Sequence, residues 1–126
     1  MRRRSGFTLI ELLIVLSIIA LLVSLVTPRY FASLDRAKET ALKTSLSVLR
    51  EAIDQYAADR GRYPDSLGAL VQARYLRQLP DDPVTGKAST WVVVPPPSDA
   101  LLGGLVADVR SGATGRGQDG RLYVDW

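Results

Sequence analysis

A long apolar run near the start of the sequence limits what this chain can become. From Phe7 to Thr27 the sequence reads FTLIELLIVLSIIALLVSLVT, which holds one charged residue, Glu11, and neither glycine nor proline. At roughly 1.5 Å of rise per residue, a helix of this length crosses a hydrocarbon core of about 30 Å. The run therefore predicts one membrane-spanning helix.

Two other interpretations of the run are weaker. A cleaved secretory signal peptide usually has an apolar region of about 7 to 15 residues that ends in a site of the Ala-x-Ala type. Here the run is longer and no such site follows it. A helix buried in a soluble core rarely needs so long an apolar sequence.

The basic residues set the expected orientation. The chain has 16 Lys and Arg against 13 Asp and Glu, and Arg2, Arg3 and Arg4 account for the whole excess. These three cations precede the apolar run, and only Arg29 lies as close on its other side. We therefore expect the N-terminus in the cytoplasm and the remainder of the chain across the membrane. Because that remainder has no net charge, we expect no nucleic-acid binding.

The chain contains no cysteine and no histidine. Disulfide scaffolds, thiolate zinc sites and Ser-His-Asp triads all require one of these residues. The scattered acidic residues form no convincing catalytic pair, so we expect no enzymatic activity and no catalytic residues.

Helical patterning continues beyond Pro28. One apolar stripe recurs at spacings of three and four, and Gly61 provides a stop. We expect one helix from about Thr8 to Arg60, kinked near Pro28, whose second half packs on a small domain. The stripe consists of Leu42, Leu46, Leu49, Ile53 and Tyr56, with Arg50 largely off it.

After Gly61 the elements become short. The pattern predicts a helix over Ser66–Arg74 capped by Asp65, and strands at Trp91–Val94 and Gly104–Arg110. A glycine-rich loop and then a last short strand, Leu122–Val124, are expected to follow. The predicted fold class is α+β, with a long N-terminal helix packed on a small antiparallel sheet.

Residues 2–11 read RRRSGFTLIE, a basic stretch followed by glycine and an apolar helix with an early carboxylate. This motif resembles the processing signal of the type IV pilin and type II secretion pseudopilin superfamily. The resemblance implies that a prepilin peptidase cuts between Gly6 and Phe7 and methylates the new Phe7 amine. It divides the chain into a leader (1–6), a transmembrane assembly segment (7–27) and a periplasmic α+β domain (28–126).

Glu11 lies one helical turn beyond Phe7. An acidic residue at the centre of a membrane helix costs about 2.5 to 3.5 kcal/mol, and less near the end of the run. A carboxylate at the membrane interface is one interpretation. The resemblance implies another, in which Glu11 neutralises the Phe7 amine of a neighbouring subunit and so promotes filament assembly.

The similarity continues through AIDQYAADRGRYP at residues 52–64 and LPDDP at residues 79–83. These segments look like the major pseudopilin of type II secretion. The resemblance implies a single-pass subunit of the bacterial inner membrane, which assembles with itself and other pseudopilins on a secretion platform to drive export of folded proteins. The alternatives are a type IV pilin of a surface fibre, serving adhesion, motility or DNA uptake, and a monomeric membrane-anchored binding domain.

Major pseudopilins typically bind calcium through a C-terminal loop, and Ca²⁺ takes about six to eight oxygen ligands. The matching residues here that supply charge are Asp119, with Asp125 or Asp108. The acidic cluster is thinner than the resemblance leads us to expect, because Thr114-Gly115 stands where an Asp-Gly pair is usual. The other interpretation is a metal-free loop in which Asp119-Gly120 is a turn pair.

Overall fold

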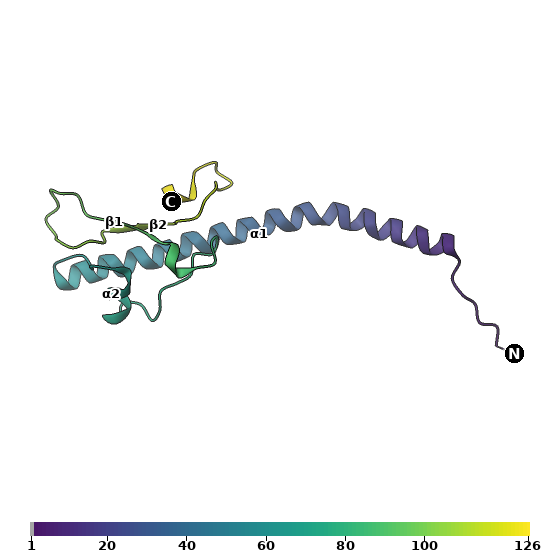
Figure 1. The fold of residues 1–126 in the computed structure, drawn as a ribbon, viewed down its shortest axis with the longest axis horizontal. Helices are drawn as coiled ribbons and strands as arrows, with labels where there is room; N and C mark the ends of the chain where they lie inside the picture. The colour runs from purple at the N-terminus through teal and green to yellow at the C-terminus, as the bar shows by residue number, and fades with distance from the viewer. Residues whose placement is uncertain (1) are drawn as a thin grey trace. The chain divides into compact units, whose positions relative to one another are not determined.

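The computed structural model describes residues 2–126, and its longest element is the helix α1, Leu9–Arg60 (Figure 1). The helix continues through Pro28 without interruption, which confirms the long predicted helix. The kink expected at Pro28 stays a prediction. The chain forms two compact units that divide within α1, the first ending at Asp35 and the second running from Arg36 to Trp126.

The first unit leaves its apolar side chains exposed. Every described residue before Glu39 is exposed, and α1 is long and apolar enough to cross a membrane. Two of its hydroxyls are satisfied within the helix, because Ser17 Oγ donates to the Leu13 carbonyl and Thr27 Oγ1 to the Val23 carbonyl, each at 2.7 Å. Such bonds reduce the cost of placing a hydroxyl in hydrocarbon.

The second unit is organised around the apolar face of α1. The predicted stripe is confirmed, since its leucines and Ile53 are almost fully buried and Tyr56 packs against them. Gly61 ends the helix with a φ of 68°, a left-handed conformation that glycine adopts without a steric penalty. The rest of the core comes from later segments: Leu67, Leu70, Trp91, Val106, Val109 and Trp126.

A short helix, α2 (Leu67–Gln72), follows the long one. Its N-cap is Ser66, whose Oγ accepts from the Ala69 amide at 3.2 Å. The predicted cap, Asp65, was wrong, because that carboxylate is held by Arg62 at 2.7 Å instead. The helix is also shorter than predicted, since Arg74 adopts a φ of 64° and turns the chain away.

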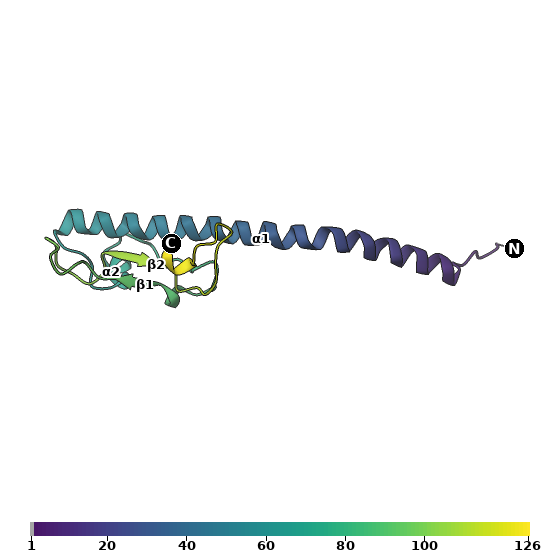
Figure 2. The ribbon, with the colours of Figure 1, turned by 90° about the horizontal axis from the view of Figure 1, so that it is seen from above.

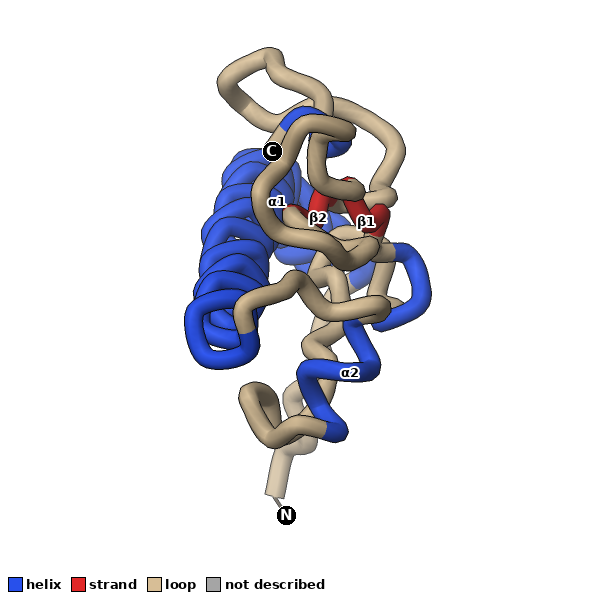
Figure 3. The backbone as a smooth tube through the Cα atoms, turned by 90° about the vertical axis from the view of Figure 1, so that its left-hand side faces the viewer, coloured by secondary structure: helices blue, strands red, loops and turns tan. Residues whose placement is uncertain are grey.

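The sheet has two antiparallel strands, β1 (Val92–Val94) and β2 (Asp108–Arg110), in a register that pairs Val93 with Val109. Both predicted strands exist but are shorter than expected. Within the second unit, both strands and α2 lie on one side of α1 (Figures 2 and 3). A short 3-10 helix, η1 (Ala88–Thr90), precedes β1.

The predicted last strand was wrong. Residues Tyr123–Asp125 form a second 3-10 helix, η2, and Leu122 makes only an isolated bridge to Arg116. A 3-10 turn brings residues that are three positions apart to the same side of the chain, and Tyr123 and Trp126 have this spacing. The rings of Tyr123 and Trp126 accordingly meet edge-on with their centroids 5.2 Å apart.

Candidate functional site

The predicted processing site lies in the non-helical segment before α1. Gly6 is exposed, and a Cβ added to it would meet no atom within 4 Å. Packing within this chain therefore gives no reason for glycine at this position. Phe7 is also accessible, with 87% of its surface exposed.

Thr8 and Glu11 form a capping box at the start of α1. The Glu11 amide donates to Thr8 Oγ1 at 3.2 Å, and the Thr8 amide donates to Glu11 Oε2 at 3.3 Å. Reciprocal bonds of this kind satisfy two amide donors that a helix start leaves unpaired. Our sequence analysis missed this role, although a threonine followed three residues later by glutamate is its known signature.

The capping box holds the Glu11 carboxylate at the N-terminal end of α1, close to Phe7 in the sequence. A carboxylate has two oxygens and about four acceptor positions, so one bond to the Thr8 amide leaves capacity for a further donor. The pairing of Glu11 with a Phe7 amine of another subunit stays a prediction.

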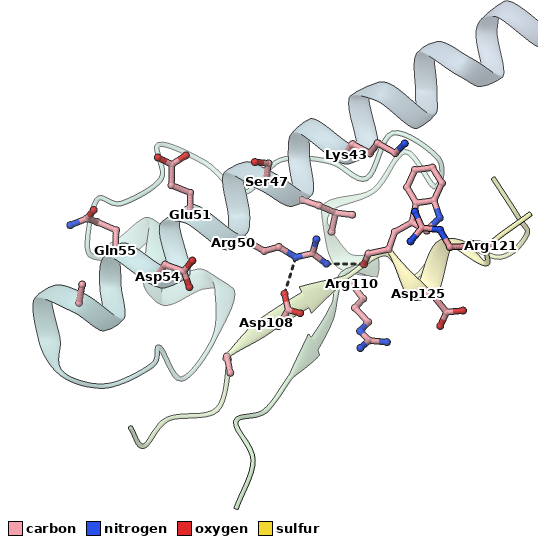
Figure 4. Close-up of a pocket in the computed structure, with 14 residues that line it drawn as sticks. Lys43, Ser47, Arg50, Glu51, Asp54, Gln55, Asp108, Arg110, Arg121 and Asp125 are labelled. Atoms are coloured by element: carbon pink, nitrogen blue, oxygen red, sulfur yellow. Dashed lines mark hydrogen bonds and ion pairs between the residues drawn. The ribbon is translucent and has the colours of Figure 1, made fainter. Parts of the chain in front are cut away.

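Asp108, a predicted calcium ligand, forms an ion pair with Arg50. Figure 4 shows the guanidinium beside Asp108, with its Nε 2.9 Å from Asp108 Oδ1. Its Nη2 donates to the carbonyls of Val109 at 3.0 Å and Trp126 at 2.8 Å. Asp108 Oδ1 also accepts from the Val109 amide at 2.7 Å. Our sequence analysis placed Arg50 off the buried stripe and missed this contact.

Asp119 and Asp125, the other predicted ligands, lie in different local settings. Asp119 Oδ1 accepts from the Arg121 amide at 3.0 Å, and Oδ2 from Arg121 Nε at 2.9 Å. These hydrogen bonds hold the pKa of Asp119 below its usual range. Asp125 lies in η2 and lines an open groove beside α1, together with Arg50 and Asp108. Within residues 2–126, no group of three or more acidic side chains is arranged to hold a metal ion.

Glu39 is a carboxylate that the sequence analysis did not single out. It is buried on α1, where its Oε1 accepts from the Gln118 amide at 2.7 Å and from the Tyr123 hydroxyl at 3.3 Å. It lies three residues before Leu42, in step with the apolar stripe. The sequence did offer a signal for this contact, because a charged residue on the buried face of a helix needs a hydrogen-bond partner.

Comparison with known proteins gives one family. The model of the prokaryotic N-terminal methylation motif matches residues 1–27. Three relatives named type II secretion system core protein G come from Dickeya chrysanthemi, Klebsiella michiganensis and Pseudomonas aeruginosa. They are 35%, 36% and 36% identical over 98, 104 and 98 residues, respectively. No solved structure matches this chain.

The alignments cover 65%, 68% and 65% of this chain, and 64%, 73% and 69% of the Dickeya, Klebsiella and Pseudomonas relatives. The similarity therefore continues far beyond the apolar segment and into the second unit. The matched methylation motif and the exposed apolar half of α1 fit a membrane-anchored subunit. This chain belongs to the type II secretion system core protein G family of pseudopilins.

Proposed function

We propose that this chain is the subunit that builds the shaft of a type II secretion pseudopilus and that it catalyses no reaction. The similarity to core protein G over about two thirds of both chains is the observation that carries this proposal. An N-terminal methylation motif and an apolar helix surface that none of residues 2–126 covers support it.

In the proposed sequence of events, the precursor sits in the bacterial inner membrane with Arg2, Arg3 and Arg4 in the cytoplasm. The positive-inside preference supports this orientation, which places the second unit in the periplasm. A prepilin peptidase cuts between Gly6 and Phe7 and methylates the new amine. The accessible, non-helical backbone around Gly6 supports cleavage there, because a protease must bind its substrate in an open conformation.

The processed subunits then pack side by side through the apolar half of α1. Lipid tails are as apolar as leucine, so helices in a membrane gain little hydrophobic energy by associating. A buried amine and carboxylate supply a stronger preference, because each costs energy in hydrocarbon unless it is paired. We assign the new Phe7 amine of one subunit to Glu11 of its neighbour. Growth of the filament on the assembly platform would then push folded proteins outward.

The test compares three variants in cells that carry the secretion apparatus. Glu11→Ala should still be cleaved, while sedimentable filaments fall by at least about tenfold, the factor that corresponds to about 1.4 kcal/mol. Glu51→Ala, which removes an exposed glutamate from the second half of α1, should assemble as the unchanged protein does. Thr8→Val removes the hydroxyl of the capping box and keeps Glu11.

The third variant separates the two roles of the carboxylate. If Glu11 acts through a neighbour, Thr8→Val should retain most of the assembly. If Glu11 only caps its own helix, Thr8→Val and Glu11→Ala should lose assembly equally. Normal filaments from Glu11→Ala, or loss of cleavage with normal assembly of any cleaved material, would contradict the proposed pairing.

A further inference from the structure

The loop between Gly115 and Arg121 holds Asp119 and lies within the C-terminal region, Asp108 to Trp126, in which the family resemblance implies a calcium site. Calcium requires about six to eight oxygens, and a loop of this kind offers mainly backbone carbonyls and carboxylates. Whether those oxygens are available decides whether the residues fit the ion.

The carbonyls of this loop already accept hydrogen bonds from the protein. Tyr123 donates its amide to the Gly115 carbonyl at 3.2 Å, and Gly120 donates its amide to the Gly117 carbonyl at 3.0 Å. Arg116 Nη1 donates to the Gly120 carbonyl at 2.8 Å. The Arg121 carbonyl accepts from the Gly117 amide at 2.9 Å. These bonds direct four of the loop's carbonyls toward protein donors.

Two of the three predicted carboxylates are engaged as well. Both oxygens of Asp119 accept from Arg121, and Asp108 Oδ1 accepts from Arg50 and from the Val109 amide. A cation-rich environment adds to the difficulty, because Lys43 lies over the Trp126 ring at 4.8 Å and the Arg121 guanidinium at 5.9 Å from the same ring. A divalent cation would have to compete with Arg121 for Asp119 and with Arg50 for Asp108 Oδ1.

The loop is instead tied to α1 by a buried acceptor. Glu39 accepts from the Gln118 amide in the middle of the loop and from the Tyr123 hydroxyl just beyond it. A carboxylate that binds a backbone amide forms one of the stronger hydrogen bonds in proteins. Gly117 then packs directly beneath Trp126, where an added Cβ would lie only 2.4 Å from the indole Cζ2.

We propose that this chain closes its C-terminal loop with Arg121, Asp119 and Glu39 in place of a metal ion, and that its fold is independent of calcium. The Arg121 guanidinium supplies the positive charge on which the loop closes. The Glu39 carboxylate supplies the anchor to the helix.

The first experiment uses the full chain purified in detergent and needs no variant. Thermal unfolding is followed by tryptophan fluorescence in excess CaCl₂, in excess EDTA and in MgCl₂ as a control for ionic strength. We expect the melting temperatures in the three solutions to agree within about 1 °C. An ion that bound the native state tightly would raise the melting temperature by more than this. We also expect no saturable heat when Ca²⁺ is added in a calorimeter. A saturable calcium heat together with a calcium-dependent rise in melting temperature would overturn the proposal.

The second experiment tests the arginine itself through amide hydrogen exchange. Arg121→Gln should speed exchange of the amides of Gly117 and Gln118 by about fivefold or more, because loss of the ion pair opens the loop locally. Arg62→Gln removes an arginine from a comparably exposed ion pair elsewhere and should leave these amides unchanged. Unchanged loop exchange in Arg121→Gln, or exchange that Ca²⁺ slows in the unaltered chain, would contradict the proposed closure.

Discussion

Arg50 joins α1 to β2 and to Trp126, so its replacement tests how the second unit is held together. Its guanidinium contacts Asp108 Oδ1 at 2.9 Å and the carbonyls of Val109 and Trp126 at 3.0 and 2.8 Å. A glutamine at this position is shorter and uncharged, and its amide reaches one of these acceptors at most. We therefore expect Arg50→Gln to loosen both segments from the helix.

The geometry gives the size of the effect. The side chains of Arg50 and Asp108 are 39% and 43% exposed, so water should reduce their ion pair to less than about 1 kcal/mol. Each bond from the guanidinium to a carbonyl adds about 1 kcal/mol after the same allowance for solvent. The expected loss in unfolding free energy is about 2 to 3 kcal/mol. For a unit of this size, that corresponds to a fall in melting temperature of roughly 8 to 15 °C.

The assay is thermal unfolding of the full chain in detergent at neutral pH. Unfolding is monitored by the near-ultraviolet circular dichroism signal of the tryptophans. Arg62→Gln is the matched control, since it breaks a more exposed ion pair, to Asp65, and should cost less than about 1 kcal/mol. Arg50→Lys keeps the charge but loses the planar fork, so it should fall between the two. A shift for Arg50→Gln no larger than that for Arg62→Gln would refute the reasoning.

Three further changes test other parts of the second unit. Asp82 is fully buried and both its oxygens accept hydrogen bonds, so Asp82→Ala should cost about 2 to 4 kcal/mol in chemical unfolding and Asp82→Asn clearly less. Gly117→Ala places a methyl against Trp126 and should cost about 1 to 3 kcal/mol, whereas Gly103→Ala, in open space, should be nearly neutral by the same measurement. Since the pKa of Asp119 is lowered in the folded chain, its stabilisation of the loop is present above about pH 4 and is lost as the pH falls through the lowered value. Loop hydrogen exchange should therefore rise in acid, once corrected for intrinsic rates, and Asp119→Asn should remove that pH dependence.

The sequence predicts the parts of this fold that repeat a pattern over many residues. The apolar run and the stripe from Leu42 to Ile53 extend over several helical turns, so both halves of α1 could be identified from the sequence. The strands were harder to place, because each has three residues and pairs only with the other. Leu122–Val124 was predicted as a strand because period-two alternation and a 3-10 turn cannot be distinguished over so few residues.

The contacts that hold the loop could not be read from spacing alone. Arg50 and Asp108 are 58 positions apart and Glu39 and Gln118 are 79 apart, so only the folded chain brings them together. The family resemblance implied a cation at Asp108, Asp119 and Asp125, and the sequence does not show that arginines contact two of these carboxylates. The capping box of Thr8 and Glu11 is different, because it is local and was available from the sequence.

The most direct test of the proposed function is the N-terminus of the protein in the membrane. Intact mass and N-terminal sequencing should be carried out on protein extracted from cells with and without a prepilin peptidase. We expect a peptidase-dependent N-terminus at Phe7 bearing one added methyl group, and the uncleaved leader when the peptidase is absent. A chain that keeps Arg2 to Gly6 in both cells would contradict processing, and with it the pairing of Glu11 with a Phe7 amine.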